Sequence, residues 1–370
     1  MAHVNPELIA CCKTAMDFAG RQLKHLVETY PDYFPMYTVG GKWKHGGQAW
    51  TNWCEGFLAG QLWLLYRYTG DEWWRAKAEH YSRLLEPRKT DREVHDLGFI
   101  FWSSWKRWYD LTGDLKVNDV IIQAGRTLAL RFKEKGRYLR SFVADDSLFI
   151  DIMMNVGIIF YAAQQTGDDD LWRVANQHCL TTRKYLVRGD GSTAHEGIFD
   201  TDTGEFLRQS THQGWRGDSS WARGLAWALY GFGTAYSFTQ DQHYLVTAEA
   251  CANFYIERTP DGVPPNDWDE PNPALPYESS AAAIAASGLL NLARLTGDPA
   301  RAYLYHDFAQ RILVRLTSPE FLAIDTPGWE GILMHGMYHQ RRGLGVDESV
   351  MWGDYFFLEA VSKVLGEANG

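Results

Sequence analysis

The sequence predicts an all-α protein built from helical hairpins, and three observations support this fold class. Apolar residues recur at spacings of three and four along most of the chain, as they do on one face of an α-helix. The tripeptide Thr-Gly-Asp, or a close variant, recurs between these stretches. Alternating β-branched runs separated by Asn-Gly or Asp-Gly, which indicate paired strands, are nearly absent.

The recurring tripeptide predicts tight turns between helices. A glycine after a helix adopts the left-handed conformation that satisfies the last carbonyl groups, and the aspartate that follows caps the next helix. The apolar stretches that end at such turns cover residues 61–68, 100–111, 153–163, 226–238 and 280–295. The turn residues are Gly70, Gly113, Gly167, Gln240 and Gly297.

A last apolar stretch, residues 351–365, bears on how the hairpins are arranged. Five or six hairpins, roughly, fit either a closed toroid or an open solenoid. This stretch is as apolar as the earlier ones and has no polar outer face, so closure is favoured. The Pro-rich segment 259–277 has similar hairpins on both sides, so we interpret it as a rim loop within one domain spanning residues 1–370.

The composition excludes several classes of protein. The chain has 370 residues and a formal net charge of -10 without a basic run, which argues against nucleic acid and anionic membranes as partners. We find no segment of membrane-spanning length and no signal-peptide pattern. The cysteines form no metal or redox pattern, so we expect reduced thiols and a cytoplasmic location. We expect no metal or organic cofactor, and a monomer or weak homodimer.

Two aspartates stand in apolar surroundings. Asp96 precedes the apolar run in "VHDLGFIF", where a helix N-cap is the ordinary interpretation. Asp151 lies in "LFIDIMM", and Asp146 or Ser147 is the better cap for its helix, which leaves Asp151 within the first turns. A carboxyl that faces a barrel lumen has its pKa raised by burial, towards the range of a general acid. Two such acids, one raised and one ionised, are typical of glycosidic chemistry.

The densest polar and aromatic segment is residues 210–233, which leads into a predicted helix. Arg223 is a candidate clamp for a carboxylate, because a guanidinium group binds a planar anion at two points; the alternative is an internal salt bridge. His195 is ambiguous between catalysis and a structural hydrogen bond. The histidines of "HGMYH" lack the glutamate of the zinc-protease pattern, so no metal site is predicted there.

Four motifs in one order, "VHDLGF", "FIDIMMN", "STHQGWRGDSSWARGLAW" and "MWGDYFFLEA", resemble the unsaturated glucuronyl hydrolases of glycoside hydrolase family 88. The resemblance extends over nearly the whole chain and implies an (α/α)6 barrel. It implies that the substrates are oligosaccharides, here of the glycosaminoglycan type. A lyase has left these oligosaccharides with a 4,5-unsaturated uronic acid at the non-reducing end. The implied reaction protonates C4 and adds water at C5, and the resulting hemiketal opens and expels the neighbouring sugar.

The same resemblance implies roles for individual residues. Asp151 is the general acid and then the base for water, and Asp96 sets its ionisation and position. The implied substrate-site residues are Trp53, His95, His195, His212, Gln213, Trp221, Arg223 and Trp227, of which His212 and Trp221 have the less defined roles. Where the family often has a longer, Trp-bearing loop, this chain has the short segment 135–148 with Phe142. Arg341 and Arg342 could contact a sulfate, although exposed arginines are usually only solvated.

Three alternatives stay open at this point. Unsaturated rhamnogalacturonyl hydrolases share the barrel and the chemistry but act on pectin fragments, and the "HD" and "THQG" patches favour the glucuronyl side. A sugar 2-epimerase also uses a helical toroid, but it would leave the ultraviolet absorbance of an unsaturated uronate unchanged. A non-catalytic oligosaccharide-binding protein would bind tightly without turnover.

Overall fold

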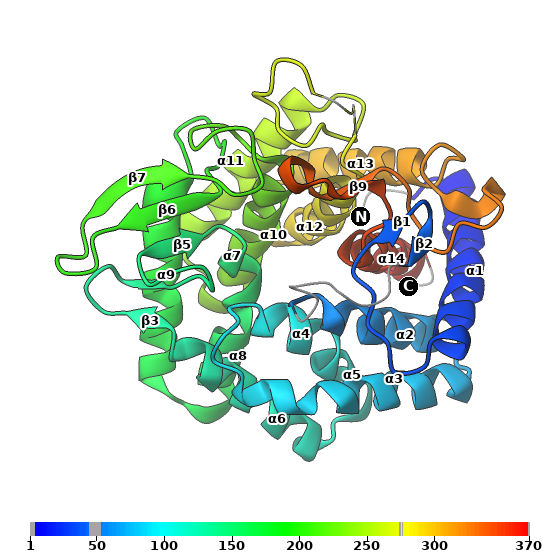
Figure 1. The fold of residues 1–370 in the computed structure, drawn as a ribbon, viewed down its shortest axis with the longest axis horizontal. Coiled ribbons are helices and arrows are strands. Elements are labelled where there is room, and N and C mark those ends of the chain that lie inside the picture. Colours follow the sequence, from blue (N-terminus) through cyan, green and yellow to red (C-terminus); the bar gives the residue numbers. More distant parts are fainter. Residues whose placement is uncertain (1–3, 44–52, 274, 276, 369–370) are drawn as a thin grey trace.

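The computed structural model describes residues 4–43, 53–273, 275 and 277–368, which form a mostly helical protein (Figure 1). The predicted fold class is confirmed in this coarse form. Two kinds of helix alternate along the chain. One kind is buried on nearly all sides, whereas the other buries a single face, as expected for helices between a core and solvent.

The buried helices contact one another in chain order, and the last contacts the first. They are α2 (Glu55–Thr69), α4 (Leu97–Ser103), α7 (Ile152–Asn155), α8 (Gly157–Thr166), α10 (Ala222–Thr239), α12 (Ser279–Leu295) and α14 (Met351–Ala368). We call this set the inner helices. The remaining helices pack outside them and are α1 (Pro6–Thr29), α3 (Glu72–Leu85), α6 (Leu115–Ala129), α9 (Asp169–Leu186), α11 (Gln242–Arg258) and α13 (Pro299–Leu316). The short α5 (Trp105–Thr112) continues α4 after a break at Ser104.

The Thr-Gly-Asp turns connect these helices as predicted. The cap residues Gly70, Gly113 and Gly167 are left-handed, and each following aspartate accepts a backbone N–H of the next helix. Gln240 adopts the same conformation, with φ of 56°. The fifth turn differs, because α12 ends on the extended residue Thr296 and Gly297 does not have a positive φ.

The structure also contains short strands, for which the sequence contains almost no signal. They are β1 (Thr38–Val39), β2 (Lys42–Trp43), β3 (Phe132–Lys133), β4 (Tyr138–Leu139), β5 (Ser147–Phe149), β6 (Glu196–Phe199), β7 (Phe206–Ser210), β8 (Gly336–His339) and β9 (Leu344–Glu348). Strands β5, β6 and β7 form one antiparallel sheet, and the others pair as hairpins. Such short strands offer too few residues for alternation to be recognised. Single-turn 3-10 helices cover Glu86–Thr90, Ala323–Asp325 and Gln340–Arg342.

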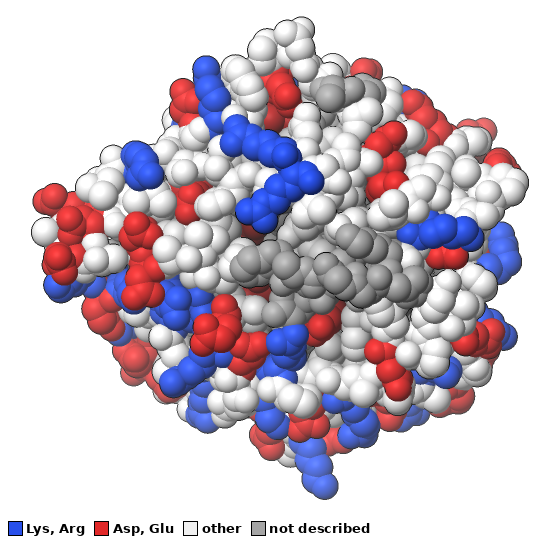
Figure 2. All heavy atoms as spheres, viewed as in Figure 1, with Lys and Arg blue, Asp and Glu red and all other residues white. Residues whose placement is uncertain are grey.

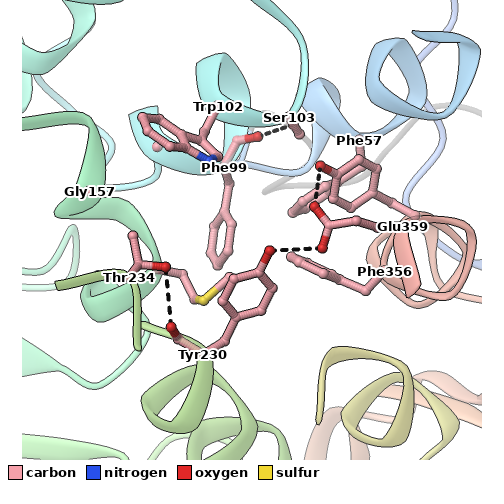
Figure 3. A pocket seen from close by; sticks show the side chains of 12 residues that line it. Phe57, Phe99, Trp102, Ser103, Gly157, Tyr230, Thr234, Phe356 and Glu359 are labelled. Atoms are coloured by element: carbon pink, nitrogen blue, oxygen red, sulfur yellow. Dashed lines mark hydrogen bonds between the residues drawn. The ribbon is translucent and has the colours of Figure 1, made fainter. Parts of the chain in front are cut away.

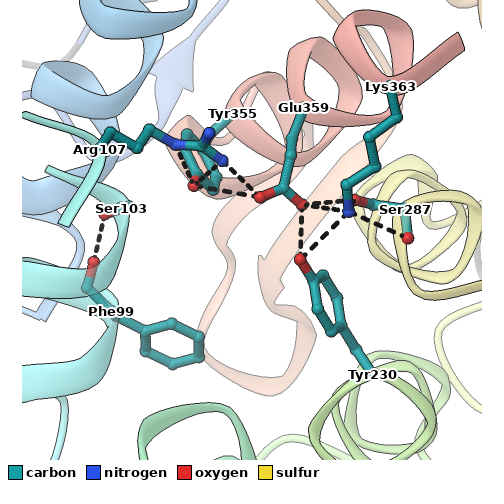
Figure 4. A network of polar contacts seen from close by, with 8 residues as sticks. All are labelled: Phe99, Ser103, Arg107, Tyr230, Ser287, Tyr355, Glu359 and Lys363. Carbon is teal, nitrogen blue, oxygen red and sulfur yellow. Dashed lines mark hydrogen bonds and ion pairs between the residues drawn. The ribbon is translucent and has the colours of Figure 1, made fainter. Parts of the chain in front are cut away.

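A buried ionic network ties α5, α10, α12 and α14 together (Figure 4). The Glu359 carboxylate accepts hydrogen bonds from Tyr230 (2.9 Å) and Lys363 (3.2 Å). Arg107 and Ser287 donate to the same carboxylate. Burial acts to raise the pKa of Glu359, but these cations and hydroxyl groups outweigh it and lower the pKa to about 2. The charge of Glu359 is therefore compensated inside the protein.

A small cavity of about 30 Å³ lies beside this network (Figure 3). It is lined by the rings of Phe57 and Phe99 and by the polar groups of Tyr230 and Glu359. This volume suits about two water molecules. Phe99 also packs on Trp227, with ring centroids 4.9 Å apart. Aromatic rings thus separate the ionic network from the larger cavity that Trp227 lines.

The surface carries both signs of charge. Figure 2 shows acidic and basic side chains interspersed over most of one face, with a row of basic side chains in its upper half. The net charge of -10 is therefore not concentrated in one acidic patch on this face. Among the described helices, none combines the length and the apolar character needed to cross a bilayer.

Candidate active site

The N-terminal ends of several inner helices meet at a cavity of about 400 Å³. Asp96 stands at the N-cap position of α4, Asp151 at that of α7, and Arg223 lies in the first turn of α10. The predicted site residues that line this cavity are Trp53, His95, Asp96, Asp151, His212, Gln213, Arg223 and Trp227. Segments separated by more than a hundred residues in the sequence therefore contribute to one site.

His95 holds a defined neutral form next to Asp96. Its Nδ1 accepts the backbone N–H of Phe142 at 2.9 Å, so the ring proton resides on Nε2. Nε2 lies 3.3 Å from Asp96 Oδ1. Burial lowers the pKa of His95 well below its usual value, and the positive charge of Arg131 adds to this effect. His95 is thus a neutral ring whose Nε2–H lies beside the Asp96 carboxyl group.

Asp151 and Asp96 are neighbouring acids, and Asp151 is the less buried of the two. Its Oδ1 is shielded from solvent and has no hydrogen-bond partner among the described residues. Burial raises the pKa of Asp151 to about 7, and the cation Arg223 and the ring of His212 offset only part of this effect. The pKa of Asp96 is also raised, by burial and then by the charge of Asp151. The site therefore retains a proton near neutral pH, as a general acid requires.

The local structure around Asp151 differs from the sequence prediction. We expected Asp146 or Ser147 to cap this helix, but Ser147 lies in strand β5, and Asp151 itself occupies the N-cap position. Neither Asp151 nor Asp96 uses its side chain to cap its helix. Asp96 therefore occupies the N-cap position, but the interpretation that its side chain makes the capping hydrogen bond is wrong. Both carboxyl groups stay free for other partners.

His195 carries a second polar group without a partner among the described residues, although its ring does not line the cavity. Its backbone oxygen accepts the N–H of Ile150 at 2.9 Å, beyond the end of the β5–β6 pairing. Its Nδ1 accepts the N–H groups of His212 (3.2 Å) and Gln213 (3.4 Å), so the ring proton resides on Nε2. That Nε2 is buried and has no partner among the described residues. The ring packs on Trp221, which does not itself line the cavity.

Arg223 is held more tightly than a simple clamp requires. Its guanidinium carbon lies 4.4 Å from the ring centroid of Trp221 and 5.1 Å from that of Trp352. Its terminal nitrogens donate to the carbonyl oxygens of Met337 and Tyr338 and to the side chain of Gln213. The predicted internal salt bridge is not found among the described ion pairs. Much of the donor capacity of Arg223 is therefore used by the protein itself.

Aromatic rings form one wall of the cavity. The Trp53 ring lies 4.7 Å from that of Trp352 and is stacked at 6.3 Å on Tyr338. Such flat faces suit the C–H side of a sugar ring, in addition to their packing role. Phe142, the aromatic residue of the short segment 135–148, also lines the cavity and packs on His95.

Sequence reasoning missed several residues of this cavity. Phe149, Tyr338 and His339 line it, and the last two belong to "HGMYH", which we had considered only as a metal motif. Arg342 lines the cavity, whereas Arg341 donates a hydrogen bond to the backbone oxygen of Trp215. The described residues contain no cluster of three or more His, Cys, Asp or Glu side chains able to hold a metal ion.

Comparisons with known proteins agree on one family. No protein-family model matches the chain. An unsaturated glucuronyl hydrolase of Formosa agariphila is 36% identical over 84% of this chain and 80% of its own length. That of Bacillus sp. strain GL1 is 32% identical over 96% of each chain. A solved unsaturated glucuronyl hydrolase specific for heparin matches with a TM-score of 0.90 at 30% identity, covering 98% of both chains. The chain therefore belongs to the unsaturated glucuronyl hydrolases, which are glycoside hydrolases.

Proposed function

We propose that this protein releases the 4,5-unsaturated uronic acid from the non-reducing end of glycosaminoglycan-type oligosaccharides by hydrating its vinyl ether. One observation carries the proposal. Asp151 faces a cavity of roughly disaccharide size with a pKa raised to about 7 and with an oxygen that has no protein partner. A carboxyl group in this state can give a proton to a carbon atom at neutral pH and then accept one from water.

The proposed reaction balances without a cofactor. Asp151 donates its proton to C4, and the electrons of the C4–C5 double bond form the new C–H bond. The positive charge left at C5 is shared with the ring oxygen, and water attacks C5 while its proton returns to Asp151. The C5 hemiketal then opens by breaking the bond to the ring oxygen, and the hemiacetal left at C1 expels the neighbouring sugar as an alcohol.

The other site residues support these steps. We assign to Asp96 the role of setting the ionisation and the position of the Asp151 carboxyl group, and to His95 the role of orienting Asp96. The Nε2–H of His195, which lacks a partner, is suited to hold a water or sugar oxygen beside Asp151. The rings of Trp53 and Trp227 are proposed to bind the sugar faces. The remaining assigned substrate-site residues are His212, Gln213, Trp221 and Arg223.

The choice of glycosaminoglycan fragments rests on the relatives. Those from Streptococcus agalactiae and Streptococcus pyogenes are named unsaturated chondroitin disaccharide hydrolases, at 32% and 28% identity. A solved structure of the S. agalactiae enzyme contains dGlcA-GalNAc6S, an unsaturated disaccharide. We propose the same class of substrate for this chain, in preference to pectin fragments. To rank glycosaminoglycan against pectin fragments as substrates, we would compare the turnover of chondroitin, hyaluronan, heparin and pectin disaccharides side by side.

The proposal extends to the architecture and the state of the protein. The closed sequence of contacts among the inner helices supports a single (α/α)6-barrel domain over residues 1–370. We propose a monomer or weak homodimer, which sedimentation across a concentration range tests. A cytoplasmic location is consistent with the buried thiols of Cys12, Cys54, Cys179 and Cys251.

The direct experiment follows the ultraviolet absorbance of the conjugated enoate while the purified protein is mixed with unsaturated disaccharides. We expect the absorbance to fall. Because the protonated form of Asp151 acts first, kcat should decrease as the pH rises through about 7. If no unsaturated uronide loses absorbance, pectin-derived ones included, the proposed function is wrong.

A further inference from the structure

Glu196 is a buried carboxylate next to the substrate cavity that the assignments above leave without a role. It opens strand β6, and its side chain is only 3% exposed. Ser147 Oγ of β5 donates to Glu196 Oε1 at 2.5 Å. The Nε2 atom of His212 lies 3.3 Å from Glu196 Oε2. Burial acts to raise the pKa of Glu196, but its bonds to His212 and Ser147 outweigh this effect and lower the pKa.

His212 connects this carboxylate to the cavity. Its side chain is 40% exposed and lines the cavity together with Asp151. Its ring lies against Phe149 at 5.4 Å and near His195 at 6.1 Å. With Nε2 turned to Glu196, the other ring nitrogen, Nδ1, is left to face substrate. No hydrogen bond from Nδ1 occurs within the described part of the chain.

The substrate places a carboxylate on C5, next to the carbon atoms that react. A cation must meet this charge, because an uncompensated anion in a buried site is costly. Arg223 contributes charge, but its terminal nitrogens donate to Met337, Tyr338 and Gln213. His95 and His195 each accept backbone N–H groups on Nδ1, and burial lowers the pKa of both. Among the cations and rings of the cavity lining, which also include Arg342, His212 is the residue paired with a buried carboxylate, and its side chain is 40% exposed.

We propose that Glu196 is a positioning residue that holds His212 at the cavity wall, so that His212 binds the carboxylate of the unsaturated uronate through Nδ1–H. This inference rests on the proposed function and adds a residue to it. An imidazolium ring between two carboxylates makes two charge-assisted hydrogen bonds, which are stronger than neutral ones.

The charged ring also acts on the general acid. The titratable and charged groups around His212 are Glu196 from β6, Asp151 at the start of α7, Arg223 from α10, and the rings of His195 and His339. The charge of His212 lowers the pKa of Asp151 and so opposes the larger effect of burial. Loss of that charge should move the alkaline limb of kcat to higher pH.

The test compares Glu196→Gln with wild type on an unsaturated chondroitin disaccharide across pH. We expect KM to rise by about 10- to 100-fold, as for loss of a hydrogen bond between charged groups, with a smaller change in kcat. The alkaline limb of kcat should shift upward. Ser147→Ala is the matched control, because it removes a different donor to Glu196 and leaves His212 in place. It should keep the KM and the pH limb of wild type. Unchanged KM and pH limb in Glu196→Gln would overturn the proposal.

Two further variants separate this role from a purely structural one. If Glu196 acts through His212, the double variant Glu196→Gln/His212→Asn should be no worse than His212→Asn alone. Additive losses would assign Glu196 an independent role and overturn the proposal. If Glu196→Gln does not fold, His212→Asn still tests the charge. The methyl ester of the substrate should bind more weakly than the acid to wild type, but equally to His212→Asn. If wild type itself turned over no unsaturated disaccharide, the proposed function would be refuted instead.

Discussion

Asp151 and Glu359 are both buried carboxyl groups associated with the inner helices, yet their pKa values are shifted in opposite directions. The pKa of Asp151 is raised to about 7, and that of Glu359 is lowered to about 2. Burial acts to raise both values. The difference arises from partners, because Glu359 is bonded to Arg107, Lys363 and three hydroxyl groups, whereas Asp151 Oδ1 is bonded to nothing in the described protein.

This contrast shows how one fold can keep a reactive and a structural carboxyl group. Glu359 has its charge satisfied and ties α14 to α5, α10 and α12 (Figure 4). Asp151 is left unsatisfied at the wall of a cavity, which costs folding free energy but keeps a transferable proton. Aromatic rings, among them Phe99 and Trp227, lie between the two regions and prevent the cations of the network from reaching the acid.

The largest expected effect comes from removing the proton of Asp151. Asp151→Asn keeps the size of the side chain but has no acidic proton for C4. Because general acid catalysis contributes about 10²- to 10⁴-fold, and this residue acts as acid and base in turn, we expect kcat to fall about 10³-fold or more. Calorimetry should show substrate binding within about threefold of wild type, since the contacts of the aromatic wall and the cations remain. A variant with near-normal kcat would remove Asp151 from the mechanism.

The next largest effect concerns folding. Glu359→Gln leaves Arg107 and Lys363 buried without their counter-charge, which should lower the free energy of unfolding by about 3 to 5 kcal/mol. Urea titration measures this loss. Glu28→Gln is the control, because Glu28 is about half exposed in a loose pair with Lys24, and it should cost less than about 0.5 kcal/mol. Equal effects of both variants would show that the network is not stabilising as an ion pair.

Asp354 provides an intermediate case that sharpens the comparison. Its carboxylate accepts the backbone N–H groups of Ile332 (3.0 Å) and Leu333 (2.9 Å). Burial still raises its pKa to about 7, so two neutral donors do not replace a cation. Asp354→Asn should cost about 1 to 2 kcal/mol in urea unfolding, because the amide offers a single acceptor atom for two donors. A loss as large as that of Glu359→Gln would contradict this ranking.

The last expected effect is a gain in folding stability, in Asp151→Asn. A carboxyl whose folded pKa is about 7, above its usual 3.8, destabilises the folded state once the unfolded chain ionises. Stability is lost as the pH rises from about 4 through 7. Asp151→Asn should therefore raise the free energy of unfolding at pH 8 and change it little at pH 4. Glu359 has the opposite sign, since its contribution is present above about pH 4.5 and is lost as the pH falls towards 2. Thermal unfolding at several pH values tests both signs.

The parts of the fold that were predictable from sequence are those with local signals. The turn at Gly70 and Asp71 needs only two adjacent residues, one for the left-handed cap and one for the next N-terminus. The helical period likewise appears within a single stretch of chain. At Gly297 the predicted turn between helices is present and Asp298 caps the second helix, but the predicted left-handed glycine is wrong, because Thr296 ends the first helix in an extended conformation. Nothing in the tripeptide distinguishes this copy from the others.

The site was only partly predictable, because its pairings are long-range. Asp151 stood out as an acid among apolar residues, but its position after a strand depends on pairing with residues 196–198. Glu196 gave no signal of its own, since its importance lies in Ser147 and His212, which come from other segments. Two of the acceptors of Arg223, Met337 and Tyr338, lie in β8, more than a hundred residues further along the chain. No local pattern encodes such contacts.

The contacts of α14 have a consequence for how the protein is made. This helix packs against α2 and α12, supplies Trp352 to one face of Arg223, and carries Glu359. A growing chain emerges from the ribosome at about 5 to 20 residues per second, so α2 waits many seconds for its neighbour. Contacts of such long sequence separation also slow folding. The face of α2 that packs on α14 therefore stays uncovered until the end of synthesis, and a nascent chain that lacks α14 has no closed core.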